Sequence, residues 1–426
     1  MNRSAVILIG AFFLLLARAH SAEAATLTYH DRHFLYTLTS STAWQGSETH
    51  YEYEGFPIEL PVGVLSGTGT LPPGIQRVTT GNWDREAIAF SIRDNIAAVH
   101  DREPGSVTIS KNGSGVILFE GVGMPGQKVD IDAAVDLTIA ALEAGVNRVT
   151  LPLIHTPPSV TVTDPGLRAQ GIQELVTIGE SDFSNSPVNR VHNIGVGLRK
   201  FNGHIIPKDS VFSFVGTLGP VDASTGYREE LVIKGDKTIP DYGGGLCQIS
   251  STAYRGVWEY GFPIVQRKNH SYSVSHYFPQ GTDATIYPPN VDMKFKNDSP
   301  GDLLIQTYQE NELAYFLFYG TKDDRRSEVI GPFTWGRTNP PPDRVEKTAD
   351  LPPGETRKVG KAVPGVKAMW FRLLQKPGQE PVVESVFSNY EARPNYTQVG
   401  VDAAELIPAG SGGALDVEVP TWFGGD

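Results

Sequence analysis

The stretch DYGGGLCQISSTAYRGVWEYG, residues 241–261, contains Cys247, the single cysteine of this 426-residue chain, directly after three glycines. Its apolar residues recur three or four positions apart, which is the spacing of one helix face: Leu246, Ile249, Ala253, Val257 and Tyr260. The spacing predicts a helix over residues 245–260 that begins at about Cys247. Strand-like segments follow over residues 263–320, so we expect this helix to pack on an antiparallel sheet.

A cysteine at the start of a helix has a particular chemistry. The first turn presents unpaired N–H groups and a partial positive charge, and both stabilise a thiolate, so the pKa of the Cys247 thiol should fall. The same N–H groups can hold the oxyanion of a tetrahedral intermediate. The arrangement suits a nucleophile that attacks a carbonyl. The alternative is a buried, inert cysteine that packs as a small hydrophobic residue.

The residues beside Cys247 are candidates for substrate binding. Gly243, Gly244 and Gly245 tolerate positive φ and allow a substrate backbone to come close. We predict that these three glycines, together with Gln248, line the substrate site.

The segment NHSYSVSHYF, residues 269–278, is a candidate source of a base. Its alternation predicts a strand that carries His270, Tyr272, Val274 and His276 on one face. A histidine on such a strand can activate a thiol at a helix start. We predict His270 as the catalytic base, with His276 as the second choice and as a substrate-binding residue.

A third group would orient the imidazole, as in a catalytic triad. Asp283 and Asp292 are the candidates, and Asp283 is the predicted catalytic residue, although either carboxylate can instead cap a turn. Arg267 is predicted to bind a substrate carboxylate, with a solvated surface arginine as the alternative. Neither an HExxH pattern nor a phosphate-binding loop occurs, so we expect no metal and no cofactor.

The N-terminus predicts the compartment. The apolar run at residues 5–17 follows Arg3 and precedes Ala22-Glu23-Ala24, which has the form of a signal peptide with its cleavage site. The run is shorter than the roughly 20 residues of a membrane span, and an uncleaved anchor is the alternative. We therefore expect an exported protein, in the periplasm or on the extracellular side of a bacterial envelope, without a membrane segment after signal removal.

Composition narrows the partners and the fold class. The net charge of −12 argues against nucleic acid or anionic lipid as the main partner. The sequence predicts a strand-rich, multidomain α+β protein with clear helices at 130–145 and 189–201 and a hairpin over 106–124. The expected parts are a signal peptide (1–24), an α+β domain (25–170), a central domain (180–320), a linker (321–345), a small β module (346–400) and a mobile tail (401–426).

A series of short motifs along the central domain carries a family resemblance. They are Asn189-Arg190, Asn193-Ile194, Asn202-Gly203, Ile206-Pro207, FSF at 212–214, Gly226-Tyr227, GGGLCQISSTAY at 243–254, His270-Ser271, GTDA at 281–284 and DMKFKN at 292–297. In this order they resemble the VanW domain over roughly residues 180–320. The resemblance implies a bacterial cell-envelope protein of a family named for its occurrence in some vancomycin-resistance clusters.

Some members of that family resemble a distinct class of L,D-transpeptidase. This likeness implies that Cys247 attacks the peptide bond after the third residue of a peptidoglycan stem peptide, with His270 as base. Transfer of the acyl group to the side-chain amine of another stem would give a 3–3 cross-link.

The flanking regions carry two further resemblances. Residues 100–170 are similar to a peptidoglycan-binding domain that often precedes VanW domains. Residues 346–400 look like the surface module named for five glycines, which is associated with envelope adhesion and amino-sugar binding. The implied partners are therefore stem peptides and glycan.

Three functions remain open from the sequence. The first is a cysteine L,D-transpeptidase, and the second is a papain-like cysteine endopeptidase of the wall, which differs only in using water as acceptor. The third is a non-catalytic peptidoglycan-binding accessory protein in which Cys247 is structural.

Overall fold

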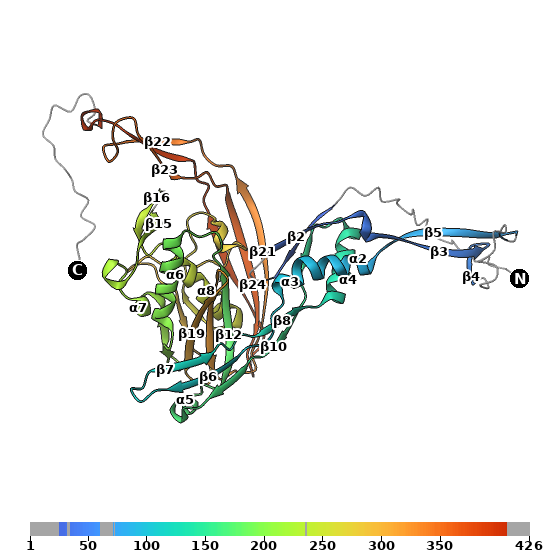
Figure 1. Cartoon of the computed structure of the whole chain (residues 1–426), viewed down its shortest axis with the longest axis horizontal. Coiled ribbons are helices and arrows are strands. Elements are labelled where there is room, and N and C mark those ends of the chain that lie inside the picture. The colour runs from blue at the N-terminus through green and yellow to red at the C-terminus, as the bar shows by residue number, and fades with distance from the viewer. Residues whose placement is uncertain (1–24, 32–34, 60–70, 72, 235–236, 407–426) are drawn as a thin grey trace, which may run out of the picture. The chain divides into compact units, whose positions relative to one another are not determined.

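The computed structural model describes residues 25–31, 35–59, 71, 73–234 and 237–406. The predicted signal peptide and the tail from residue 407 lie outside these residues. The chain forms two compact units (Figure 1): Met1–Arg102 with Gln127–His155, and Glu103–Gly126 with Thr156–Asp426. The predicted first domain, residues 25–170, is therefore divided differently, because residues 103–126 and 156–170 pack with the second unit.

The first unit combines two small sheets with helices. One sheet has the order β2-β1-β9 and the other the order β4-β3-β5. Their strands are β1 (Thr26–His30), β2 (Leu35–Thr39), β3 (Gln45–Tyr53), β4 (Phe56–Ile58), β5 (Ile75–Trp83) and β9 (Arg148–Thr150). The helices are α2 (Arg85–Ile92), α3 (Ala98–His100) and α4 (Ile131–Ala144), with short turns at Thr42–Trp44 (η1) and Arg93–Ala97 (η2). Strands β8 (Gly126–Val129) and β10 (Leu153–Thr156) pair in a two-stranded sheet.

Helix α4 confirms the helix predicted at residues 130–145. The Asp130 side chain caps its start by accepting the Ala133 N–H at 3.1 Å. Gly145 ends the helix with a φ of 66°, a left-handed conformation that glycine adopts without steric cost. The buried face of α4 packs Ala134 and Val135 into a core that also contains Trp44.

The second unit is organised around an antiparallel sheet with the order β12-β20-β19-β13. Its strands are β12 (Glu174–Asp182), β13 (Ile205–Ile206), β19 (Leu303–Glu310) and β20 (Leu313–Gly320). Helices α6 (Val188–Phe201) and α8 (Leu246–Tyr260) pack on this sheet, and α7 (Phe214–Leu218) packs against α6. The predicted fold class is confirmed: a strand-rich, multidomain α+β protein whose cysteine-bearing helix lies on an antiparallel sheet.

Helix α8 approaches strand β12 unusually closely. A Cβ atom at Gly179 would clash with the carbonyl oxygen of Thr252, and one at Gly256 would lie 2.6 Å from the Gly179 nitrogen. The two glycines therefore permit backbone-to-backbone packing that fixes α8 on the sheet. The Ser181 and Thr252 hydroxyls, 2.6 Å apart, add a buried hydrogen bond between the same two elements.

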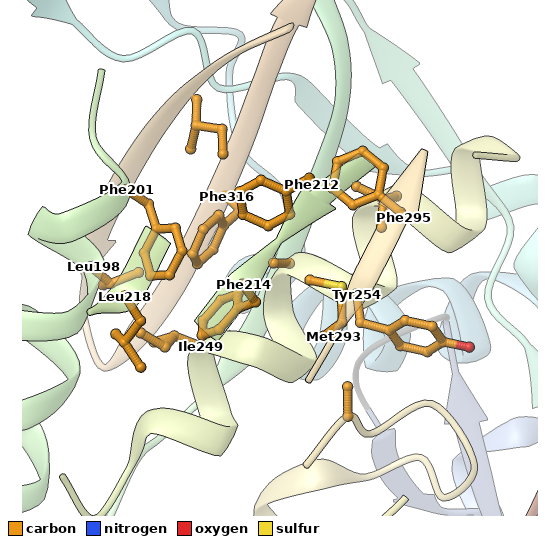
Figure 2. Packing of buried hydrophobic residues seen from close by; sticks show 14 of the residues in the cluster. Leu198, Phe201, Phe212, Phe214, Leu218, Ile249, Tyr254, Met293, Phe295 and Phe316 are labelled. Atoms are coloured by element: carbon orange, nitrogen blue, oxygen red, sulfur yellow. The ribbon is translucent and has the colours of Figure 1, made fainter. Parts of the chain in front are cut away.

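Aromatic rings fill the core between α6 and the sheet. Figure 2 shows Phe201, Phe214 and Phe316 together, and the Phe201 ring centroid lies 4.3 Å from that of Phe214 and 5.3 Å from that of Phe316. Ile249 of α8 is fully buried in the same cluster. Leu246, Ile249, Ala253 and Val257 of the predicted apolar face are buried, but so are polar residues off that face, such as Gln248 and Arg255, so α8 packs on nearly all sides.

Smaller sheets complete the second unit. They have the orders β11-β6-β7, β14-β18-β17 and β15-β16. Their strands are β6 (Ser106–Lys111), β7 (Ile117–Gly121), β11 (Ser159–Val162), β14 (Val211–Ser213), β15 (Glu229–Lys234), β16 (Lys237–Tyr242), β17 (Ile264–Gln266) and β18 (Lys294–Lys296). Short helical segments lie at Pro165–Ala169 (α5), Ala223–Thr225 (η3) and Ser275–Tyr277 (η4). Strands β6 and β7 form the hairpin predicted over residues 106–124.

The C-terminal region forms two three-stranded sheets with the orders β21-β24-β25 and β22-β26-β23. The strands are β21 (Arg326–Thr338), β22 (Arg344–Thr348), β23 (Thr356–Gly360), β24 (Gly365–Gln375), β25 (Val382–Tyr390) and β26 (Tyr396–Gly400), and Ala403–Leu406 (η5) follows. The predicted linker at 321–345 is wrong, because most of it is β21, which pairs with β24. The proline-rich segment that suggested a linker is only the short connection from β21 to β22.

The segment at residues 269–278 also differs from its prediction. It forms the short turn η4 within an irregular loop, not a strand, so His270 and His276 do not share a strand face. The loop is fixed instead by side-chain hydrogen bonds, which the alternation of residues does not reveal.

Candidate functional site

Cys247 lies in the first turn of α8, which begins after Gly245. Gly243 and Gly245 have φ values of 81° and 110°, so both require the conformational freedom of glycine. A Cβ atom at Gly244 would lie 2.8 Å from the Glu230 Cβ and 2.9 Å from the Leu231 carbonyl oxygen. The three glycines thus shape the chain before the helix and let β15 approach. This requirement is structural, and the predicted contact with substrate stays a prediction.

The Cys247 side chain is half-buried at the edge of the core. Its Sγ lies 3.5 Å from the Thr285 hydroxyl and 3.7 Å from the Ile286 carbonyl oxygen. Ser251, one turn later, donates to the Cys247 carbonyl and accepts the Ala284 N–H at 2.9 Å. Ser251 therefore joins the start of α8 to the segment that follows Asp283.

His270 lies against both Cys247 and Asp283. Its Nδ1 is 2.6 Å from Oδ2 of Asp283, and its backbone N–H donates to the same oxygen at 2.7 Å. Because Nδ1 is bonded to a carboxylate, Nε2 is the ring nitrogen left to interact with the Cys247 thiol, whose pKa the His270 side chain lowers. The Tyr277 ring stacks on the imidazole, with 4.4 Å between centroids and 14° between planes. The ring is thus held on one face and at one edge.

Asp283 is buried and accepts several hydrogen bonds. In addition to the two from His270, Arg267 donates to Oδ1 at 3.2 Å and the Tyr390 hydroxyl donates to the same oxygen. The backbone carbonyl of Asp283 also accepts from Nε of Arg267 at 2.6 Å. The carboxylate is therefore ionised and fixed in orientation, which is the role of the third member of a catalytic triad.

The electrostatics of the three groups favour an ion pair. Burial raises the pKa of the Cys247 thiol, but the hydrogen bond and charge of His270 outweigh burial, so the pKa falls below its ordinary value. Burial lowers the pKa of His270, yet its bonds to Asp283 and Cys247 raise it to about 9. His270 and Arg267 hold the pKa of Asp283 well below its usual range, against the effect of burial. Both shifts, the lowered pKa of Cys247 and the raised pKa of His270, act in the direction of a thiolate–imidazolium pair.

The other predicted residues take different places. Asp292 accepts from the Ser213 hydroxyl at 2.6 Å and from the Val215 N–H at 2.9 Å, so it fixes the start of α7 and not His270. Gln248 is fully buried, and its amide bonds Arg190 and Ser181. The structure gives Gln248 a packing role and no surface for a substrate.

Arg267 also differs from expectation, whereas the role of His276 stays open to test. The Arg267 guanidinium is committed to Asp283 and to the Gly281 carbonyl at 3.0 Å, so it supports the carboxylate of this chain instead of one from a substrate. His276 is half-buried, and burial followed by the nearby charge of Arg190 lowers its pKa. A contact between His276 and substrate stays a prediction.

Two residues of the site were not predicted. Tyr277 is close to His270 in sequence, and its place beside the imidazole depends on the turn η4. Tyr390 comes from β25, more than one hundred positions after Asp283, and nothing in the sequence links it to the site. An irregular loop and a distant strand carry no periodic signal, so only the tertiary structure reveals them.

The remaining features of the structure concern metal binding, membrane spans and surface hollows. Within the described ranges, His, Cys, Asp and Glu side chains do not gather in groups of three or more that could hold a metal ion. Across the same ranges, every helix is too short or too polar to cross a membrane. A shallow hollow lies between the β6–β7 hairpin and the α6–β13 connection, lined by Lys111, Ile117, His204 and neighbours, and it does not include Cys247.

Comparison with known proteins agrees with this domain. Residues 189–319 match the family model of VanW-like proteins. The chain is 30% identical over 210 residues to YoaR of Bacillus subtilis, which covers 48% of this chain and 65% of YoaR. It is 30% identical over 118 residues to the vancomycin B-type resistance protein VanW of Enterococcus faecalis, which covers 26% of this chain and 42% of that protein. The chain thus spans less than two thirds of either relative.

Among solved structures, the chain is similar to the G5 domain of an IgA1 protease, at 18% identity over 19% of this chain and 99% of that domain. The TM-score of 0.12 is too low to support an argument about fold, so the five-glycine module stays a prediction. The central domain, in contrast, matches a family model over residues 189–319, and the chain is also similar to two proteins, one of which is named VanW. The chain therefore contains a VanW-like domain at residues 189–319.

Proposed function

We propose that this protein is an exported cell-envelope enzyme, a cysteine L,D-transpeptidase that forms 3–3 cross-links between peptidoglycan stem peptides. One observation carries the proposal: Asp283 bonds His270, and the His270 side chain is near enough to lower the pKa of the Cys247 thiol at the start of α8. A carboxylate, an imidazole and a thiol in this order form the constellation of a cysteine acyltransferase or hydrolase.

The first half-reaction is acylation of the thiol. The Cys247 thiolate attacks the carbonyl carbon of the peptide bond after the third residue of a donor stem, and the carbonyl electron pair moves onto oxygen. The backbone N–H of Cys247 at the start of α8 stabilises this oxyanion, since the N–H groups of Leu246 and Gln248 bond the carbonyls of Gly243 and Gly245. His270 then gives its proton to the leaving amine as the C–N bond breaks, and a thioester forms on Sγ.

The second half-reaction transfers the acyl group. The side-chain amine of another stem attacks the thioester, His270 takes the proton of that amine, and Cys247 leaves as a thiolate. A new peptide bond forms, and the enzyme returns to its starting protonation state. The donor stem, the acceptor amine and the protein together supply every atom and proton of both half-reactions.

Two further observations support an envelope role. The apolar run at residues 5–17, followed by Ala22-Glu23-Ala24, has the pattern of a signal peptide and supports export. One relative, from Enterococcus faecalis, is named as a vancomycin B-type resistance protein, and this supports the same cellular context for the present chain.

The test compares the full chain with its Cys247→Ala variant. Each is incubated with purified stem tetrapeptides and stem-peptide dimers, and the products are analysed by mass spectrometry. We expect new 3–3 dimers from the wild type and none from the variant. The exchange removes one half-buried sulfur atom, so we expect the variant to fold. Circular dichroism and thermal unfolding check that it does.

Other outcomes would replace the proposal with a named alternative. Shortened peptides without dimers would indicate a wall endopeptidase that uses water as acceptor. Unchanged peptides, with binding to intact sacculi equal in both proteins, would indicate a non-catalytic accessory protein with a structural cysteine.

A further inference from the structure

The loop that carries His270 and Asp283 is held by the C-terminal sheet. Four hydrogen bonds to backbone carbonyl oxygens join the two. From the sheet, the Glu391 N–H donates to Ser271 at 2.7 Å, the Trp370 indole to Gln280 at 2.7 Å and the Ser388 hydroxyl to Gly281 at 3.2 Å. From the loop, the Asn269 amide donates to Asn389 at 2.9 Å. A Cβ atom at Gly281 would lie 2.7 Å from the Trp370 ring, so the loop packs directly against β24. Strands β24 and β25 therefore act as the support for an irregular loop.

Tyr390, the last residue of β25, contacts the site directly. Its hydroxyl donates to Oδ1 of Asp283 and accepts the Gly281 N–H at 2.8 Å. The side chain is buried, and burial together with the negative charge of Asp283 raises the pKa of Tyr390 above its ordinary value. The hydroxyl thus stays protonated and remains a donor over the whole working range of pH.

We propose that Tyr390 is a positioning residue of the Cys247 site and that it acts through Asp283 and His270. The C-terminal sheet is by this inference a part of the site and not only an appended adhesion module. The inference deepens the proposed function, because it assumes that the Cys247 thiol is the reactive group.

The geometry gives the reason. Oδ2 of Asp283 accepts both hydrogen bonds from His270, while Oδ1 is shared between Tyr390 and Arg267. Tyr390 fixes Oδ1 and thereby the plane of the carboxylate. Without the hydroxyl, the buried oxygen is left with Arg267 alone and turns toward the guanidinium. His270 then loses part of its acceptor, and the imidazolium is less stabilised.

The test uses Tyr390→Phe in the full chain, which removes one oxygen atom and keeps the ring. The rate of Cys247 alkylation by iodoacetamide is measured from about pH 5 to 10, since only the thiolate reacts. A hydrogen bond to a charged group changes such an equilibrium by about tenfold. We expect the rate near pH 6 to fall about tenfold and the midpoint of the profile to move up by about one pH unit.

The matched control is Tyr396→Phe, a buried tyrosine on β26 that is not among the groups bonded to Asp283. We expect its alkylation profile to equal that of the wild type. Thermal unfolding of both variants shows whether each is folded at the assay temperature. A Tyr390→Phe profile that is unchanged, or that moves to lower pH, would overturn the inference.

A double-mutant cycle separates positioning from a general loss of structure. In a His270→Ala background, Tyr390→Phe should leave the alkylation profile unchanged, because the residue through which it acts is gone. An equal shift in both backgrounds would show that Tyr390 acts by another route. Iodoacetamide reports on the thiol without peptidoglycan, so the inference can hold even where the cross-linking assay fails.

Discussion

Helices α4 and α8 are nearly equal in length, with 14 and 15 residues, yet their N-termini are built differently. In α4 the carboxylate of Asp130 caps the first turn by accepting the Ala133 N–H. In α8 the residue at the same position is Gly245, which has no side chain to offer. The start of α4 therefore carries a carboxylate of its own chain, whereas the first turn of α8 holds no acidic residue beside Cys247. The N–H groups of Leu246 and Gln248 bond the carbonyls of Gly243 and Gly245 instead.

The difference shows that a helix N-terminus can either be capped for stability, as in α4, or be left without a carboxylate beside a thiol, as in α8. A carboxylate cap stabilises a helix by about 1 kcal/mol and closes its end to anions. Glycines at the start of α8 give up that stabilisation and require support from elsewhere. The support is the backbone contact of Gly256 with β12 and the hydrogen bonds of Ser251 to the segment after Asp283.

The largest expected effect comes from removing His270, the group beside the Cys247 thiol at the start of α8. His270→Ala removes the group that lowers the pKa of Cys247, so this pKa should rise. The expected result is a fall of about tenfold or more in the rate of iodoacetamide alkylation near pH 6.5, and a loss of about 10²–10⁴-fold in peptide transfer. Stopped-flow alkylation and mass spectrometry measure the two rates.

The control for this experiment is His192→Ala on α6, whose ring bonds the Gly226 carbonyl and not the thiol. Its alkylation rate should match that of the wild type. If His270→Ala kept the wild-type rate, the lowered pKa of Cys247 would come from other neighbours, such as Thr285 and the Ile286 backbone.

An intermediate effect is expected when the start of α8 is altered. Gly244→Ala places a Cβ atom 2.9 Å from the Leu231 carbonyl oxygen, so either β15 or the turn before α8 has to shift. We expect a loss of about 1–3 kcal/mol in the free energy of unfolding, together with slower alkylation of Cys247. Denaturant unfolding monitored by tryptophan fluorescence measures the stability.

The comparison variant is Gly113→Ala, where the added Cβ atom meets open space. Its stability should stay within about 0.5 kcal/mol of the wild type. Equal stabilities for the two variants would mean that α8 does not depend on the close approach of β15.

The smallest effect concerns α4. Asp130→Ala removes the cap of this helix and should cost about 1 kcal/mol of stability in the first unit, without any change in the alkylation of Cys247. Hydrogen exchange over α4 measures the local stability. A change in thiol reactivity would contradict the view that the two helix ends have separate roles.

The sequence by itself determined the main helices and the candidate position for a nucleophile. The three- and four-residue spacing from Leu246 to Tyr260 predicts the helix α8, and the glycines before it mark where the helix begins, although the burial of its polar residues was not predicted. The same logic predicted the helix at residues 130–145, which is α4, while its Asp130 cap is a finding of the structure. His270 and Asp283 were also named from sequence, on their residue types, order and motif context.

Only the tertiary structure decided how the site is assembled. It shows that Asp283 and not Asp292 bonds His270, that Arg267 binds Asp283, and that Tyr390 reaches the carboxylate from β25. It also replaces the strand predicted at residues 269–278 by an irregular loop and the linker predicted at 321–345 by strand β21. The physical reason is that these contacts join side chains far apart in the chain, where local periodicity carries no information about the partner.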